Sequence, residues 1–285
     1  MMTVITPDRL APGKHFGEAR QFLGHFGIQE QSPTLDHLET IAQEFSRIPY
    51  ENISKIINFA KHGEQTGFRL PDTIYEDYRN FRLGGTCFSL TWYLLEILRN
   101  CGYDCDPILG DMKWGKNVHS AILVYFNEGV YLVDPGYMIH QPLLISQDTQ
   151  QRHLTPHSGI EIRFNREVER YDVYTFRNGN FTWRYRFTAS GVDSEEFSQH
   201  WIASFTKPTM NGIILTRTAG GEMIYIHDDF TKVTGHEKVQ RHKSRDVAEK
   251  LILNEFGIPL DLVEEARHSL EINREVTKET VDATD

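Results

Sequence analysis

Apolar residues recur every three to four positions through the first hundred residues, which is the spacing of one helix face. This spacing predicts a helix over 16–26, with Gly27 as its stop, and a second helix over 35–45. A third predicted helix begins near Cys87 and runs to Gly102. The N-terminal part of the chain is therefore expected to be helical.

After Gly102 the pattern changes to short runs rich in β-branched and aromatic residues, which indicates β-strands. The clearest runs are "PILGDM", "VHSAILVY", "VYLVD" and the alternating "NFTWRYRF". A hairpin is expected around 219–221, and Ser244 is expected to cap a last helix that Gly257 closes. Helices, then antiparallel strands, then a small mixed tail predict an α+β fold.

Composition narrows the class of protein. The 285 residues include 39 % hydrophobic positions, which is ordinary for a soluble globular protein. The net charge of −10 argues against general nucleic-acid binding, and no apolar run is long enough to span a membrane. The N-terminus lacks the features of a secretory signal, and three cysteines suit a reducing compartment. A cytoplasmic protein that binds neither nucleic acid nor membrane is expected.

The stretch "FRLGGTCFSL" places Cys87 after two glycines and at the start of an apolar run. A cysteine nucleophile reacts as the thiolate, which a helix N-terminus and a nearby histidine stabilise. The glycines would allow a tight turn and the close approach of a substrate. His119 is a polar residue in a predicted strand that otherwise has the apolar pattern of a core strand, and Asp134 ends the next predicted strand. The alternative is that Cys87 and His119 are core residues and Asp134 is a turn residue.

Two registers of the predicted hairpin remain open. A four-residue loop over 125–128 would place His119 directly opposite Asp134. A tighter turn at 128–129 would place Leu123 there and His119 roughly 13 Å away. In the first register we expect Asp134 to accept the Nδ1–H of His119, which leaves Nε2 to take the thiol proton.

The chain resembles the arylamine N-acetyltransferase family. The resemblance rests on "GGTCF" at a helix start, and on His119 and Asp134 on successive strands fifteen residues apart. It extends to "RIPYENI" at 47–53 and to "DPGYMIHQPL" at 134–143, and it covers nearly the whole chain. Looser matches are "HWIASFTKPT" and "NEFGIPL".

The resemblance implies a helical domain over 1–102, an antiparallel β-barrel over 103–208 and an α/β lid over 209–285. Its core would be similar to that of papain-like and transglutaminase enzymes, with a Cys87–His119–Asp134 triad. It also implies transfer of an acetyl group from acetyl-coenzyme A to an aromatic amine or hydrazine, through a cysteine thioester in a ping-pong cycle. Phe88 and Tyr137 would line the acceptor pocket. The expected coenzyme A contacts are Lys116, Asn117, Ser204, Thr206 and Thr209.

Several positions depart from the family pattern. The family usually has arginine at Leu83, and this arginine pairs with the glutamate that corresponds to Glu51. It usually has glutamate and asparagine where this chain has Ser89 and Thr91. The family's glycine-rich loop after the aspartate is replaced by Met138, Ile139 and His140.

Two further hypotheses remain: a thiol hydrolase or transglutaminase-like enzyme, and a non-enzymatic scaffold on the same fold. No metal site is expected, because Cys101 and Cys105 lack a second Cys or His pair.

Overall fold

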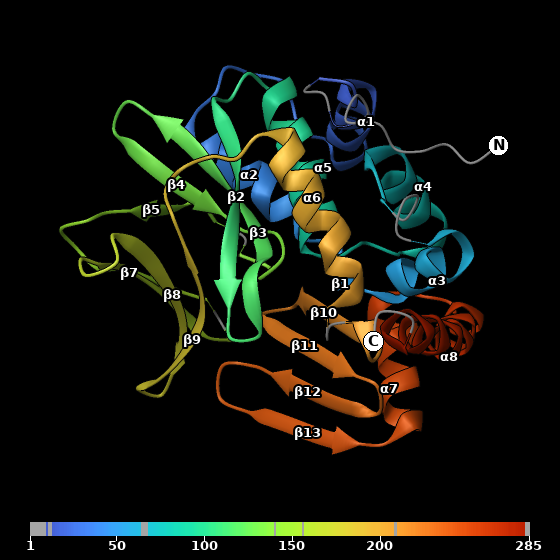
Figure 1. Cartoon of the computed structure of the whole chain (residues 1–285). Helices are drawn as coiled ribbons and strands as arrows, with labels where there is room; N and C mark the ends of the chain where they lie inside the picture. Colours follow the sequence, from blue (N-terminus) through green and yellow to red (C-terminus); the bar gives the residue numbers. More distant parts are fainter. Residues whose placement is uncertain are drawn as a thin grey trace.

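The N-terminal part of the computed structural model is helical (Figure 1). The structure describes residues 10, 13–63, 68–139, 141–155, 157–207 and 210–282. The helices of this part are α1 (Phe16–Phe26), α2 (Leu35–Phe45), α3 (Ile53–His62), α4 (Pro71–Phe81) and α5 (Cys87–Asn100).

The three helices predicted from periodicity are confirmed, whereas α3 and α4 were not predicted. Gly27 ends α1 in the left-handed conformation, with φ of 68°. Helix α3 has an apolar stripe at Ile53, Ile56 and Ile57, and the polar side chains of Ser54 and Lys55 are buried beside it. Helix α4 begins at Pro71, a residue that favours the first helical turn.

An eight-stranded antiparallel sheet follows, in the order β5-β4-β3-β2-β9-β8-β7-β6. Its strands are β2 (Cys105–Met112), β3 (Gly115–Phe126), β4 (Gly129–Val133), β5 (Leu143–Ile145), β6 (Gln151–Leu154), β7 (Gly159–Asn165), β8 (Arg170–Arg177) and β9 (Asn180–Phe187). The edge strands β5 and β6 contact each other, so the sheet is nearly closed into a barrel. The prediction of an α+β fold with an antiparallel barrel is confirmed.

A second sheet has the order β1-β10-β11-β12-β13, and its strands β10 to β13 lie below the barrel in Figure 1. Its strands are β1 (Tyr50–Glu51), β10 (Ile214–Ala219), β11 (Glu222–His227), β12 (Phe230–Thr234) and β13 (Val239–Lys243). The predicted hairpin is confirmed, with Ala219 opposite Glu222. Because β1 pairs with β10, the N-terminal part of the chain supplies the edge of this sheet next to the loop before Cys87.

The remaining helices are α6 (Ser194–Ala203), α7 (Arg245–Leu251) and α8 (Leu260–Asp282). Ser244 precedes α7 as predicted, but its side chain makes no capping hydrogen bond. A π-helical turn over Ile252–Phe256 follows α7, and Gly257 closes it. The helix predicted after Ser244 corresponds to α7 and this turn, and it is not the last one. The longer α8 follows it and packs on α3.

The β3–β4 hairpin has neither of the two expected registers. Phe126 pairs with Gly129 and Ile122 with Val133, so the turn is shorter than the loop that would place His119 opposite Asp134. Continued past Val133, this register places Asp134 opposite Ala121. His119 is two residues further along β3 and on the same face, a diagonal that side chains can bridge.

Candidate active site

Cys87 is the first residue of α5, where backbone N–H groups lack partners within the helix. The preceding Thr86 makes no side-chain capping bond, and no acidic residue lies in the first turn. The positive end of the helix dipole is therefore left for the cysteine and its substrate. Cys87 is partly buried, and its Sγ lies 3.9 Å from the Val118 carbonyl oxygen.

The glycines before Cys87 pack against β1 rather than forming a left-handed turn. A Cβ on Gly84 would lie 1.9 Å from the Pro49 carbonyl oxygen, so no larger residue fits without displacing backbone. The Gly85 carbonyl accepts the Glu51 N–H at 3.0 Å. The expected role of the glycines in substrate approach is therefore corrected. They let the loop before Cys87 lie against the strand.

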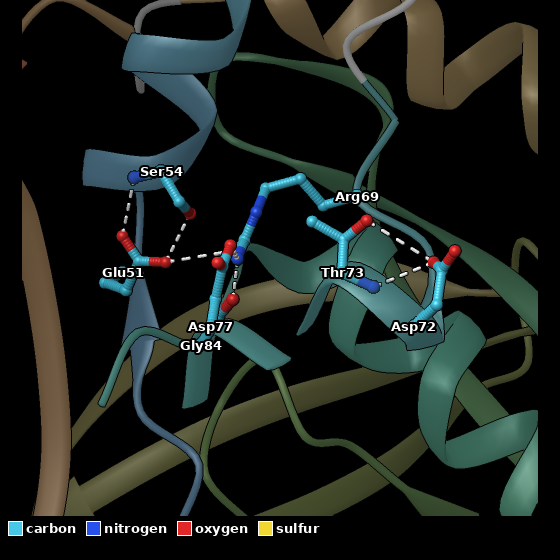
Figure 2. Close-up of polar contacts among 7 residues, drawn as sticks. All are labelled: Glu51, Ser54, Arg69, Asp72, Thr73, Asp77 and Gly84. Carbon is cyan, nitrogen blue, oxygen red and sulfur yellow. Dashed lines mark hydrogen bonds and ion pairs between the residues drawn. The ribbon is translucent and has the colours of Figure 1, made fainter. Parts of the chain in front are cut away.

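Arg69 contacts both this loop and Glu51 on β1 (Figure 2). Its Nη1 donates to the Gly84 carbonyl and lies 3.4 Å from Glu51 Oε1, and its Nη2 lies 2.6 Å from Asp77 Oδ2. Glu51 also accepts hydrogen bonds from the backbone and the hydroxyl of Ser54. The buried carboxylate of Glu51 is thus fully engaged beside the loop that carries Cys87.

The sequence reasoning missed Arg69, which pairs with Glu51 although Leu83 occupies the usual arginine position of the family. Leu83 is buried in the core, and Arg82 stacks on Tyr78, with its guanidinium 5.4 Å from the ring centroid. The absence of the family arginine at Leu83 was the available signal that Glu51 needs another basic partner, and that partner lies eighteen residues away from it in sequence.

The other departures have local roles in packing α5. Ser89 is buried and donates to the Thr86 carbonyl at 3.0 Å. Thr91 donates to the Ser120 carbonyl at 3.1 Å, which ties α5 to β3 next to His119. Met138 and Ile139 are buried beyond the aspartate, and His140 lies outside the described residues.

We predict that Arg69→Met destabilises the fold by about 3–5 kcal/mol, because it leaves a buried carboxylate unpaired. Urea denaturation monitored by circular dichroism measures the change. Asp77→Asn is the matched control, since the side chain of Asp77 is 29 % exposed and this end of the network should contribute about 1 kcal/mol or less. Equal losses of stability for the two variants would show that the buried contact of Arg69 with Glu51 contributes no more than its contact with Asp77.

Asp134 is fully buried and receives three hydrogen bonds. His119 Nε2 lies 2.8 Å from Oδ2, the Tyr185 hydroxyl donates to Oδ2 at 2.7 Å, and the Tyr137 N–H donates to Oδ1 at 3.0 Å. The rings of Tyr137 and Tyr185 lie 5.0 and 4.5 Å from that of His119. The carboxylate and the two tyrosines together fix the orientation of the imidazole.

Tyr185 was not singled out from the sequence. The alternation of "NFTWRYRF" predicted the strand and placed Tyr185 on the same face as Trp183 and Phe187. The available signal was its hydroxyl, because a tyrosine on a strand face that is expected to be buried needs a polar partner for this group.

Burial by itself lowers the pKa of His119, but the charge and hydrogen bond of Asp134 and a hydrogen bond with Cys87 outweigh it. The pKa of His119 rises to about 10, so the ring is an imidazolium at neutral pH. The expected assignment of its nitrogens is wrong. Nε2 faces Asp134, so Nδ1 is the nitrogen left for the thiol.

Gly136 allows the cysteine and the histidine to approach each other. A Cβ at this position would lie 2.8 Å from Cys87 Cβ and 3.0 Å from His119 Cε1. The three predicted triad residues therefore lie together, although the hairpin register differs from the expected one.

A cavity of about 910 Å³ opens onto Cys87 and His119. Phe88 and Tyr137 line it, and the fully buried ring of Phe88 also packs on Phe197 and Trp201. Lys55 is a further lining residue that the sequence reasoning missed. Burial lowers its pKa to about 8, against the opposing effect of Cys87, and its Nζ donates to Ser204 Oγ at 2.6 Å.

The residues expected to contact coenzyme A lie in different surroundings. Ser204 lines the cavity and is hydrogen-bonded to Lys55, whereas Lys116 and Thr206 are exposed and do not line it. The side chain of Asn117 lies 3.0 Å from His200 Nε2. Thr209 lies outside the described residues. Their contacts with coenzyme A stay predictions.

Cys101 and Cys105 differ from Cys87 in their surroundings. Burial raises their pKa values to about 11 and about 12. We predict that iodoacetamide near neutral pH alkylates Cys87 first, because its thiol lies beside the imidazolium and at the cavity. Peptide mapping by mass spectrometry follows the three sites separately. Equal alkylation rates would contradict a reactive Cys87.

The known proteins that this chain resembles point to one class. A family model described as N-acetyltransferase matches residues 34–265. The structure of the arylamine N-acetyltransferase from Mycobacterium abscessus is similar, with a TM-score of 0.75, 14 % identity, and coverage of 93 % of this chain and 99 % of that one. The structure of the Mycobacterium marinum arylamine N-acetyltransferase in complex with CoA has a TM-score of 0.72, 16 % identity and coverage of 90 % and 97 %.

Among curated proteins, the chain is similar to the uncharacterized acetyltransferase YvcN of Bacillus subtilis (strain 168). The two are 26 % identical over 174 residues, which cover 55 % of this chain and 67 % of that protein. Fold and family match together define an enzyme of the acetyltransferase class. The chain belongs to the arylamine N-acetyltransferase family, as the resemblance in sequence predicted.

Among the described residues, no helix has the length and apolar character needed to cross a membrane. The same part of the chain holds no group of three His, Cys, Asp or Glu side chains arranged for a metal ion.

Proposed function

We propose that this enzyme transfers an acetyl group from acetyl-coenzyme A to an aromatic amine or hydrazine through a thioester on Cys87. The observation that carries the proposal is the buried His119–Asp134 pair, 2.8 Å apart, beside a cysteine at a helix N-terminus and a cavity. Acetyl-coenzyme A acts as a co-substrate, and no metal takes part.

In the first half of the cycle, the Cys87 thiolate attacks the acetyl carbonyl and forms a new carbon–sulfur bond. The bond to the coenzyme sulfur breaks, and the departing thiolate takes the proton that His119 holds on Nδ1. Unpaired N–H groups in the first turn of α5 are suited to stabilise the oxyanion that develops on the carbonyl. Asp134 and Tyr185 keep the ring oriented during the transfer.

In the second half, the acceptor amine attacks the thioester carbonyl and His119 takes the proton that the amine releases. The amide forms as the carbon–sulfur bond to Cys87 breaks, which restores the thiolate and imidazolium pair. Phe88 and Tyr137 are proposed to line the acceptor side of the cavity. Lys116, Asn117, Ser204, Thr206 and Thr209 are proposed to contact coenzyme A.

Intact-mass analysis after incubation with acetyl-coenzyme A tests the proposal. The enzyme should gain one acetyl group, and addition of an arylamine should remove that group and produce the acetylated amine. Release of acetate without amide formation would favour a thiol hydrolase. An enzyme that gains no acetyl group at saturating donor would overturn the proposal.

A further inference from the structure

The cavity that opens onto Cys87 has an unusual balance of charge. Among the described residues, several Lys and Arg side chains line the cavity, whereas no Asp or Glu does. The basic side chains are Lys55, Arg177, Arg184, Lys207, Lys232 and Arg241. In a chain with a net charge of −10, this concentration of positive charge favours an anionic ligand in the cavity.

Arg184 on β9 has a guanidinium that is only partly engaged. Its Nε donates to Thr175 Oγ1 at 2.7 Å, which holds the side chain in place. Neither Nη has a hydrogen-bond acceptor among the described residues. The next residue, Tyr185, hydrogen-bonds Asp134, so the backbone of Arg184 is adjacent to the reacting centre. A held guanidinium with free Nη groups suits a planar carboxylate.

Two further cations face the cavity from the second sheet. Lys232 on β12 is directly opposite Arg241 on β13, an arrangement of like charges that costs stability. Burial, together with Arg241, Arg184 and Arg177, lowers the pKa of Lys232, so the four cations share one neighbourhood. Arg177 is engaged with backbone carbonyls, including that of Gly235 at 2.7 Å. A bound anion would relieve the repulsion among the others.

Aromatic rings line the same cavity as these cations and Cys87. Tyr137 neighbours His119, and its pKa is affected by Arg184, so it lies close to both. Phe176, Tyr225 and Phe230 line the same cavity. Because Tyr137 lies close to both His119 and Arg184, a ligand with an aromatic ring between its amine and its anionic group fits this arrangement.

We propose that Arg184, with Lys232 beside it, binds the carboxylate of an aromatic amine acceptor and makes the enzyme selective for acidic arylamines. This inference rests on the proposed function and names the class of acceptor. Arg184 is then a specificity-determining residue, and it takes no part in the chemistry on Cys87.

The test compares 4-aminobenzoate with its methyl ester as acceptors for the acetylated enzyme. We expect wild type to favour 4-aminobenzoate in kcat/KM. Arg184→Gln should lower that value roughly tenfold or more, as expected for loss of a charged hydrogen bond, and leave the ester within about twofold. Lys232→Gln should act in the same direction. Lys238→Gln is its matched control, because it removes the same charge from an exposed position between β12 and β13.

Acetylation of the enzyme, followed by intact mass, separates failure of this inference from failure of the proposed function. If the enzyme acetylates normally but Arg184→Gln affects both acceptors alike, the inference is wrong and the function stands. If the variants instead weaken use of acetyl-coenzyme A but not of acetyl-pantetheine, which lacks the nucleotide phosphates, the cations serve the coenzyme. That outcome also overturns the inference.

Discussion

The Cys87→Ala variant should gain no acetyl group from acetyl-coenzyme A and should form no acetylated amine. The change removes the only thiol that lines the cavity among the described residues, while the neighbouring imidazole and helix N-terminus remain. Stability should change little, because Cys87 is partly exposed and the substitution removes one small atom. Intact mass and product analysis measure the two losses, and thermal unfolding checks the fold.

Cys101→Ala is the control for this experiment, since it removes a thiol that does not line the cavity. It should be acetylated at the same rate as wild type. Acetylation of Cys87→Ala at a comparable rate would show that another group is the nucleophile, and it would remove the thioester from the mechanism.

Asp134→Asn should lower acetyl transfer on the order of 10²- to 10⁴-fold per folded molecule, by analogy with serine triads. Three donors converge on this carboxylate, from His119, Tyr185 and the backbone of Tyr137. Asparagine has one acceptor oxygen, so its amide N–H must face at least one of these donors. It also removes the negative charge that raises the pKa of His119 to about 10 and keeps the ring protonated.

Stopped-flow measurement of the rate of Cys87 acetylation reports this loss directly. Tyr185→Phe is the comparison, because it removes one hydroxyl donor and leaves the charge and the ring contact with His119. Its rate should fall far less than that of Asp134→Asn. If folded Asp134→Asn keeps full activity, the carboxylate has a structural role only.

Local patterns in the sequence predicted much of the fold and part of the candidate site. The spacing of apolar residues in α1 and α2 follows from the burial of one helix face, and the alternation in β9 follows from the two faces of a strand. The position of Cys87 at the start of α5 could also be read locally. These features depend on residues within about one or two turns or on neighbouring positions of a strand.

Tertiary structure decided which of these residues meet. The order Cys87, His119, Asp134 named the triad, but a shift of two residues in the β3–β4 register determined that the carboxylate reaches Nε2 along a diagonal. A turn with two more residues would keep the same side chains on the same face and fit the same apolar pattern, so periodicity alone does not fix the contact.

The tertiary structure likewise determined which residue pairs with each buried polar group. Arg69 pairs with Glu51 although α3 lies between them in the chain, and Tyr185 on β9 reaches Asp134 at the end of β4 past β2 and β3. The sequence by itself determined that such buried groups need partners, since an unpaired buried charge is costly. It did not determine which partner, because residues remote in the chain compete for each group and only packing brings one within hydrogen-bonding distance.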